Sequence, residues 1–324
     1  MFFSNSNQGK YHLKAIVLAA SYGTRLQPLT DSLPKPLVPV VGRPLLLYTI
    51  MKLKKCKVTG IGINIHHNAG MLKAYLERVQ PGLPIEISHE QNILGVAGGI
   101  GGLRSFLREE DFFIVHNGDV LSNIDLEKLM DTYRIQQPLC AMVLHDHPQY
   151  NNVSIDEEGN IADIRATLKP AKAVKRLAYT GISFMDSGFL RYIPEGPADL
   201  VPILLDMIKE GKNKVQAIIA DECVWRDIGT VSSYFEAHKE ILIQKKPLID
   251  KSLIPRDPVF LGKGTRMEAG VALQGFVSAG ENCLLRQGCC VENCIIWDNA
   301  VVEEGRVVKN SIIGNGWAVN VKSV

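Results

Sequence analysis

Apolar runs and amphipathic segments alternate along the chain from residue 13 to about residue 245. Short strand-like segments, several of them apolar runs, predict strands at residues 15–20, 60–65, 85–90, 112–117, 139–145 and 215–220. Apolar residues at helical spacing predict helices between them, at residues 44–55, 69–79, 99–107, 125–135 and 200–209. This alternation indicates an α/β fold. We expect a Rossmann-like, mostly parallel sheet with helices on both faces, whose ligands bind at the carboxyl ends of the strands.

Residues 151–197 show a different pattern. Two short strand-like segments, at residues 153–156 and 161–164, flank the turn-forming sequence EEGN. Turn residues between two such segments predict a β-hairpin. We expect this hairpin to be an insertion that lies over the edge of the sheet, and not a separate domain.

The periodicity changes beyond Lys246, where several prolines mark a linker. Apolar or small residues then recur every six positions, at Leu261, Met267, Leu273, Ala279, Leu285 and Val291. A second series follows four residues behind the first, at Val271, Val277, Cys283, Cys289 and Ile295. No helix has a period of six, whereas a coil of short strands does. The repeat, with a one-residue slip after Trp297, predicts a short left-handed parallel β-helix with three strands per turn. The chain thus divides into an α/β domain at residues 1–250 and a hexapeptide-repeat β-helix at residues 251–324.

Length, charge and hydropathy together indicate an ordinary globular protein and give no sign of a nucleic-acid-binding or membrane protein. The 324 residues are 46% hydrophobic and 22% charged, as in ordinary globular proteins, and are too many for one ordinary domain. Basic residues number 36 against 34 acidic ones, so the bulk charge gives no reason to expect nucleic-acid binding. The N-terminal residues lack the apolar core of a signal peptide, and no window is apolar for long enough to span a membrane. These features predict a cytoplasmic protein without a membrane partner.

Seven cysteines, an odd number, are scattered without paired metal-ligand spacing. Cys289, Cys290 and Cys294 lie close together but have no histidine nearby, so a zinc site there is the less favoured interpretation. We expect free, buried thiols, which serve as small core residues in the coil.

Residues 14–37 carry the most specific chemical pattern in the chain. The first strand leads into a loop of small residues, followed by Arg25 and, ten positions later, by Lys35 between two prolines. Small residues let backbone N–H groups approach phosphate closely, Arg offers a planar fork of donors, and Lys offers a compact charge. A glycine-containing loop alone would be weak evidence. Together with the two cations it predicts a polyphosphate site.

Several motifs, in order along nearly the whole chain, resemble those of one enzyme family. The stretch LAASYGTRLQPLTDSLPKPLVPVVGRPLL resembles the nucleotide-binding signature of the sugar-1-phosphate nucleotidyltransferases, or nucleotide-sugar pyrophosphorylases. EQNILGVAGGI resembles the family's base-contacting loop, FFIVHNGDV the strand that ends in its metal aspartate, and WRDIGT the segment with its second metal aspartate. A hexapeptide-repeat coil is frequent at the C-terminus of such proteins. The mannose-1-phosphate guanylyltransferase branch is the most similar.

This resemblance implies transfer of a nucleotidyl group to a sugar-1-phosphate, with Mg²⁺ as cofactor. The catalytic roles fall to Arg25, Lys35, Asp119 and Asp227, of which the two aspartates are the metal ligands. Taken alone, Asp119 could be a turn residue and Asp227 half of a structural ion pair. The implied nucleotide-binding residues are Ala19, Ala20, Ser21, Gly23, Thr24, Glu90, Gly95, Gly98 and Asn117. The implied sugar-phosphate contacts are Lys169, Thr180 and Gly181.

Two departures from the family pattern keep alternatives open. Ser21 stands where the family usually has Gly, which requires an ordinary φ at that position. Leu168 replaces the Glu of the family's Glu-Lys-Pro sugar contact, which puts the sugar in doubt. The first interpretation is a mannose-1-phosphate guanylyltransferase; the alternatives are a uridylyltransferase acting on an amino-sugar 1-phosphate, and a catalytically silent regulatory or scaffold homologue. The expected partners are the two substrates and further copies of the chain, joined through the coil.

Overall fold

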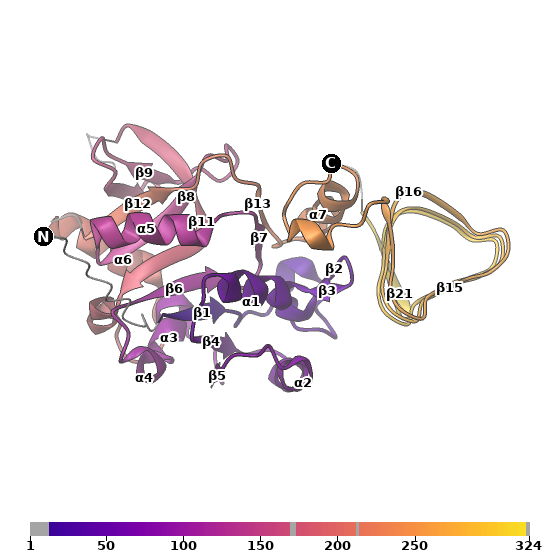
Figure 1. Cartoon of the computed structure of the whole chain (residues 1–324), viewed down its shortest axis with the longest axis horizontal. Coiled ribbons are helices and arrows are strands. Elements are labelled where there is room, and N and C mark those ends of the chain that lie inside the picture. The colour runs from indigo at the N-terminus through magenta and orange to yellow at the C-terminus, as the bar shows by residue number, and fades with distance from the viewer. Residues whose placement is uncertain (1–12, 169–172, 212–213, 322–324) are drawn as a thin grey trace, which may run out of the picture.

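A mixed sheet forms the centre of the computed structural model, which describes residues 13–168, 173–211 and 214–321 (Figure 1). Nine strands of the described part form this sheet: β1 (Lys14–Leu18), β4 (Gly60–Ile65), β5 (Ile85–His89), β6 (Phe112–Asn117), β8 (Cys140–His145), β9 (Val153–Ile155), β10 (Ile161–Ile164), β11 (Lys175–Asp186) and β12 (Val215–Ile219). β1 runs parallel to β4 and β6, β4 to β5, and β8 to β12. All six strands expected from apolar runs are confirmed, with ends that shift by no more than two residues.

Helices cover both faces of the sheet, as the sequence predicts. They are α1 (Leu45–Lys55), α2 (Ala69–Val79), α3 (Gly95–Gly101), α4 (Arg104–Leu107), α5 (Leu126–Gln136) and α6 (Leu200–Glu210). Alternate residues of β1 point to opposite faces: Val17 packs in the core with α1, α2 and α5, and Ile16 in the core with α3, α4 and α6. The helix expected at residues 99–107 is divided into α3 and α4. No helix of the described part is both long and apolar enough to cross a membrane.

The insertion differs from its expected placement. The hairpin is present, as β9 and β10 in antiparallel register. It does not lie over the sheet edge, because β9 pairs with β11 and the hairpin itself extends the sheet. β11 was not expected; it runs antiparallel to both β6 and β8 and joins the two parallel halves. The sheet is therefore mostly, but not wholly, parallel.

The C-terminal region is a stack of short parallel strands followed by one antiparallel strand. Its strands are β14 (Val259–Leu261), β15 (Arg266–Met267), β16 (Ala272–Ala279), β17 (Leu284–Leu285), β18 (Cys290–Ile296), β19 (Val301–Val302), β20 (Val307–Gly314) and β21 (Trp317–Asn320). β14, β16, β18 and β20 form one parallel ladder and β15, β17 and β19 another, while β21 pairs antiparallel with β20. Cys283, Cys289 and Cys294 are buried in the core of this coil, which confirms them as core residues.

The slip in the repeat lies earlier than expected. Gln274 pairs with Glu292, but Val277 pairs with Cys294, so the second turn loses one residue before Trp297 is reached. At this corner the single residue Asn293, with a φ of 50°, stands where the preceding turn of the coil has two residues, between Gln274 and Val277. The hexad series therefore misplaces Ile295, which packs in the core shared with α7 (Val231–Leu242), a helix that was not expected.

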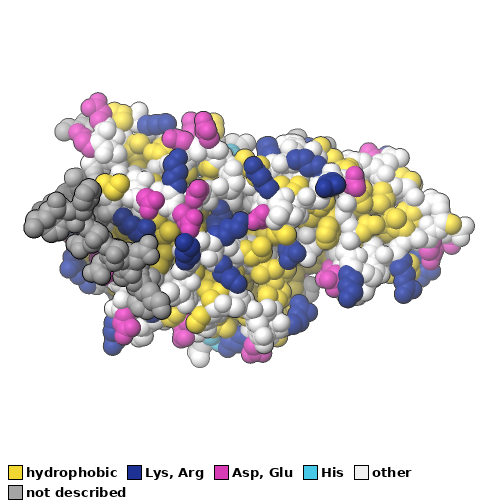
Figure 2. Space-filling model, in the orientation of Figure 1, with side chains coloured by type: hydrophobic (Ala, Val, Ile, Leu, Met, Phe, Trp, Pro, Cys, Tyr) yellow, Lys and Arg dark blue, Asp and Glu magenta, His cyan; other side chains and the backbone are white. Residues whose placement is uncertain are grey.

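One hydrophobic core joins the coil to the α/β part. Phe276, Ile295, Trp297 and Ile312 of the coil pack in the same cluster as residues of α7 and of the first part of the chain. The Phe276 ring lies 5.0 Å from the Phe235 ring, centroid to centroid. Figure 1 shows α7 between the sheet and the coil. The surface over these elements mixes basic, acidic and apolar side chains on the face shown in Figure 2.

Candidate active site

The small-residue loop after β1 is fixed by a buried asparagine. Asn64 of β4 accepts hydrogen bonds through Oδ1 from the backbone N–H of Ala19 (2.7 Å) and of Ala20 (3.4 Å). Gly23 has a φ of 66°, and a Cβ there would lie 2.9 Å from Thr30 Cγ2. Positive φ values occur at Gly23 but not at Ser21, so Ser21 takes its place in the loop without the backbone freedom of glycine. The short 3-10 helix Thr24–Leu26 then positions Arg25.

Glu90 supports this loop from within the protein. Its Oε1 accepts a hydrogen bond from Asn64 Nδ2, and its Oε2 accepts one from the Leu94 N–H, both at 2.8 Å. The residue is only 2% exposed. The buried carboxylate is thus bonded to Asn64 and to the loop before α3. The expected contact between Glu90 and a nucleotide base stays a prediction. Asn64 was missed, although a polar residue in the apolar run of β4 was the available signal.

Gly95 and Gly98 allow a close approach of backbone segments. A Cβ at Gly95 would lie 2.7 Å from Ala198 O, and one at Gly98 would lie 2.7 Å from Gly196 O. The Gly98 N–H donates to Ala198 O (3.0 Å). These glycines therefore let α3 pack against the segment before α6, and a larger residue at either position would collide with that segment. Their contact with a base stays a prediction.

Asp119 and Asp227 meet at the end of a two-stranded ribbon. Asp119 follows β6 and Asn117, and the next strand, β7 (Val120–Ser122), pairs antiparallel with β13 (Trp225–Asp227). Asp227 stands opposite Val120 in this register, and the Ile228 N–H donates to Asp119 O (2.9 Å). The ribbon thus brings together two aspartates that are far apart in the sequence. Arg226 pairs with Glu240 at 2.5 Å, so Arg226 has a carboxylate partner other than Asp227.

The two carboxylates interact strongly. Burial, and next the negative charge of Asp119, raise the pKa of Asp227 to about 6, while Lys35 and Arg25 oppose this shift. Asp227 Oδ1 is buried and has no hydrogen-bond partner in the described part of the protein. Two adjacent carboxylates with an unsatisfied oxygen suit a divalent cation, since Mg²⁺ commonly takes one or two carboxylates plus substrate oxygens and water. No cluster of three or more potential metal ligands occurs among the described residues, so substrate would have to complete the coordination.

Both expected cations lie at the aspartate pair. Lys35 Nζ lies 2.5 Å from Asp119 Oδ2, and the Lys35 residue is 8% exposed. A Cβ added at Gly229 would lie 3.2 Å from Arg25 Nη2 and 2.9 Å from Asp227 Oδ2. Arg25 and Asp227 therefore flank Gly229. The structure brings together the four charged residues that the sequence singled out.

Gly229 is accordingly a sensitive position, although its φ is ordinary. We expect Gly229→Ala to lower kcat/KM by about a hundredfold, because the new methyl group would displace the Asp227 carboxylate. Steady-state assays would measure this, with the melting temperature as a check on folding. Gly70→Ala is the matched control, since a Cβ at Gly70 meets nothing within 4 Å. Equal activity of the Gly229→Ala and Gly70→Ala chains would show that a methyl group at residue 229 does not displace the Asp227 carboxylate.

Of the three residues expected to contact the sugar-phosphate, the structure describes Thr180 and Gly181. The Thr180 hydroxyl is fully buried and donates to Val143 O (2.8 Å), and its expected contact with a sugar-phosphate stays a prediction. Thr180 O instead accepts from Trp225 Nε1 (2.8 Å). Gly181 has a φ of 79° and packs against Asn117, where a Cβ would lie 2.9 Å from Asn117 Nδ2. Lys169 lies outside the described residues. Sequence reasoning also missed an aromatic cluster around Trp225, formed by His145, His147 and Tyr150.

The arrangement has counterparts among known proteins. Residues 14–244 match the nucleotidyl transferase family. The chain belongs to that family. Residues 255–323 match the GMPPB C-terminal domain. The resemblance to sugar-1-phosphate nucleotidyltransferases inferred from the motifs is thus confirmed.

Similar curated proteins span most of the chain. A UTP–glucose-1-phosphate uridylyltransferase of Synechocystis is 28% identical over 88% of this chain and 83% of that protein. Mannose-1-phosphate guanylyltransferase 1 of Arabidopsis thaliana is 26% identical over 93% of this chain and 86% of that protein. A glucose-1-phosphate thymidylyltransferase of Streptomyces antibioticus is 25% identical over 84% and 83%. The names of these relatives give three different nucleotides and two different sugars, glucose and mannose.

Solved structures show the same fold over about two thirds of the chain. A putative glucose-1-phosphate thymidylyltransferase of Bacillus anthracis superposes with a TM-score of 0.61 and 25% identity, over 69% of this chain and 93% of that one. HddC of Yersinia pseudotuberculosis, in a complex with GMP-PN, gives a TM-score of 0.57 at 22% identity, over 69% and 97%.

Proposed function

We propose that the chain joins a nucleoside triphosphate to a sugar-1-phosphate and releases pyrophosphate. A phosphate oxygen of the sugar-1-phosphate attacks the α-phosphorus, and the bond from that phosphorus to the pyrophosphate leaving group breaks. The attacking oxygen is already anionic at neutral pH, so no general base is needed. The observation that carries this proposal is the convergence of Arg25, Lys35, Asp119 and Asp227 beside the loop after β1.

The main difficulty of this reaction is the mutual repulsion of two polyanions. Asp119 and Asp227 would hold Mg²⁺, which when bound neutralises phosphate charge and stabilises charge in the transition state. Arg25 offers its guanidinium to phosphate oxygens, and Lys35 can turn from Asp119 toward substrate. The loop from Ala19 to Thr24 would present backbone N–H groups to the triphosphate.

For the substrates we propose GTP and mannose-1-phosphate. Support comes from the match of residues 255–323 to the GMPPB C-terminal domain and from the guanylyltransferases among the relatives. The uridylyltransferase relative favours UTP with a glucose-type or amino-sugar phosphate as the second candidate. A silent homologue is disfavoured because all four charged residues are present and lie together.

A matrix assay tests these candidates. GTP, UTP, dTTP, ATP and CTP are each combined with mannose-1-phosphate, glucose-1-phosphate and N-acetylglucosamine-1-phosphate, and pyrophosphate release is measured. We expect GTP with mannose-1-phosphate to be turned over fastest. A faster UTP pair would replace the substrate assignment and keep the reaction type. Release at background level for every pair would contradict the proposed function.

We further propose that residues 1–250 form the catalytic unit, and that residues 251–324 form a left-handed β-helix that joins copies of the chain. Light scattering of the full chain tests the assembly: we expect an oligomer, and a monomer at all concentrations would contradict this role. We also propose a cytoplasmic location.

A further inference from the structure

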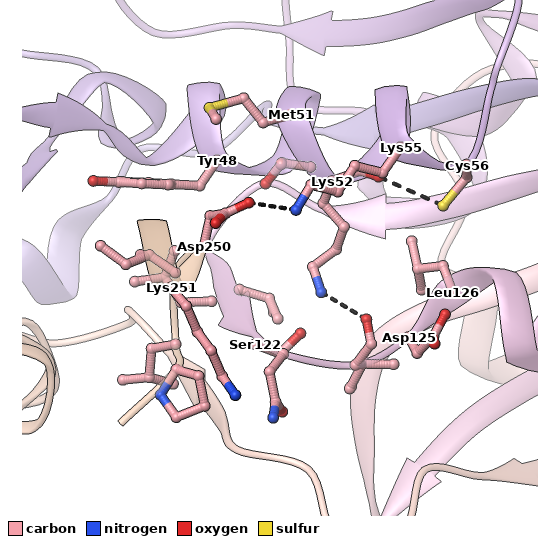
Figure 3. A pocket seen from close by; sticks show the side chains of 18 of the residues that line it. Tyr48, Met51, Lys52, Lys55, Cys56, Ser122, Asp125, Leu126, Asp250 and Lys251 are labelled. Carbon is pink, nitrogen blue, oxygen red and sulfur yellow. Dashed lines mark hydrogen bonds and ion pairs between the residues drawn. The ribbon is translucent and has the colours of Figure 1, made fainter. Parts of the chain in front are cut away.

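A cavity lies apart from the four charged residues of the proposed active site. Its volume is about 480 Å³, and α1, β7 with the loop that leads to α5, and residues 247–251 enclose it (Figure 3). None of Arg25, Lys35, Asp119 and Asp227 lines it. Apolar atoms of Tyr48, Leu248 and Ile249 form part of its wall. A volume of this order fits a small organic molecule.

The carboxylates that line this cavity are largely occupied. Asp125 Oδ1 caps α5 by accepting from the N–H groups of Glu127 (3.1 Å) and Lys128 (3.2 Å). Asp250 accepts from Lys55 through one oxygen and from Ser252 through the other. Glu127 itself is exposed. The wall therefore has little free capacity to bind a cation.

Donors in the same wall have capacity left. Lys52 Nζ donates to Ile124 O (2.8 Å) and forms no ion pair with a carboxylate of the described residues. Lys251 Nζ has no hydrogen bond or ion pair within the described part of the chain, and Ser122 Oγ is buried without a partner. In Figure 3 the side chains of Lys52 and Lys251 extend toward the space beside Ser122. Burial lowers the pKa of Lys52 to about 8, which still leaves it mainly charged at neutral pH.

We propose that this cavity is a second ligand site, which takes a small phosphate ester. Lys52, Lys251 and Ser122 bind the phosphate group. Two ammonium groups and a hydroxyl offer several hydrogen-bond donors, which the oxygens of a phosphate can accept more fully than the two oxygens of a carboxylate. The organic part of the ester packs against Tyr48, Leu248 and Ile249. Ser122 ends β7, the strand that begins directly after Asp119, so the ligand contacts the ribbon that carries both aspartates.

The test must separate this cavity from the polyphosphate site. Inorganic phosphate and glycerol 1-phosphate are titrated into the full-length chain carrying Arg25→Ala, which weakens the loop after β1, and binding is followed by ³¹P NMR at constant ionic strength. Lys52→Met and Lys251→Ala are each added to this chain. Lys54→Ala is the matched control, because Lys54 also lies on α1 but does not line the cavity.

We expect Lys52→Met and Lys251→Ala each to weaken phosphate binding by about tenfold or more, as loss of a charge-assisted hydrogen bond does. Lys54→Ala should leave the affinity unchanged. Lys251→Ala decides the matter if Lys52→Met fails to fold, since Lys251 is exposed. Unchanged affinity in the cavity variants, or no phosphate binding by the Arg25→Ala chain, would overturn the proposal. Neither result depends on turnover, so both are separate from a failure of the proposed function.

Discussion

Replacing Asp119 or Asp227 with Asn is expected to lower kcat by about a thousandfold or more, since each change removes a charge from the site that would hold the metal. Asn keeps the size of the side chain and one oxygen. The change therefore removes the charge and one acceptor oxygen without altering the volume of the side chain. At Asp227 the same change also relieves burial of a carboxylate next to Asp119. We therefore expect the melting temperature of Asp227→Asn to equal or exceed that of the unmodified chain.

Loss of activity without loss of stability distinguishes a functional aspartate from a structural one. Pyrophosphate release at saturating Mg²⁺ and thermal unfolding are measured on the same samples. Asp206→Asn is the control, because Asp206 lies exposed on α6 and, among the described residues, pairs with Lys209 one turn away. Near-normal turnover in both active-site variants would rule out the metal-binding role of the pair.

Phe276→Ala is expected to destabilise the whole chain by about 3–5 kcal/mol, which is the usual cost of truncating a buried phenylalanine. Phe276 is 1% exposed and packs on Phe235 of α7. The same core holds Leu121 of β7, and Leu26 and Ile228, which directly follow Arg25 and Asp227 in the sequence. Loss of the ring in the coil should therefore loosen the support of the site in the α/β part.

Denaturant unfolding followed by both circular dichroism and activity would measure this effect. We expect the two signals to shift together to a lower midpoint. Met267→Ala serves as the control, because Met267 is also in the coil but is 50% exposed. If Phe276→Ala left the unfolding of the α/β part unchanged, the coil would be an independent domain that contributes nothing to the site.

Hydrophobic patterning predicted β4, β6 and β8 well because these strands are almost entirely buried and read as apolar runs. β11 escaped detection because it begins with Lys175 and Arg176 and is interrupted by Thr180 and Gly181. Its pairing with β6 and β8 depends on distant partners, which no local pattern shows. The slip at Asn293 was misplaced for a related reason, since a corner can lose a residue while the apolar period continues beyond it.

The charged residues of the site were predicted better than the hydrogen-bond partners of its polar residues. Arg25, Lys35, Asp119 and Asp227 could be identified from their motifs, and the structure places them together. Residue type alone could not show that the Glu90 carboxylate is bonded to Asn64 and Leu94. It also could not show that the Thr180 hydroxyl is bonded to Val143. Both groups are bonded within the protein, and their contact with a ligand stays a prediction.

Binding of Mn²⁺ in place of Mg²⁺ tests the central claim most directly. Electron paramagnetic resonance counts the bound ions on the full chain in the presence of a non-hydrolysable nucleoside triphosphate analogue. We expect Asp119→Asn and Asp227→Asn each to weaken Mn²⁺ binding by about tenfold or more, and Asp206→Asn to leave it unchanged. Equal Mn²⁺ affinity in all four chains would contradict it.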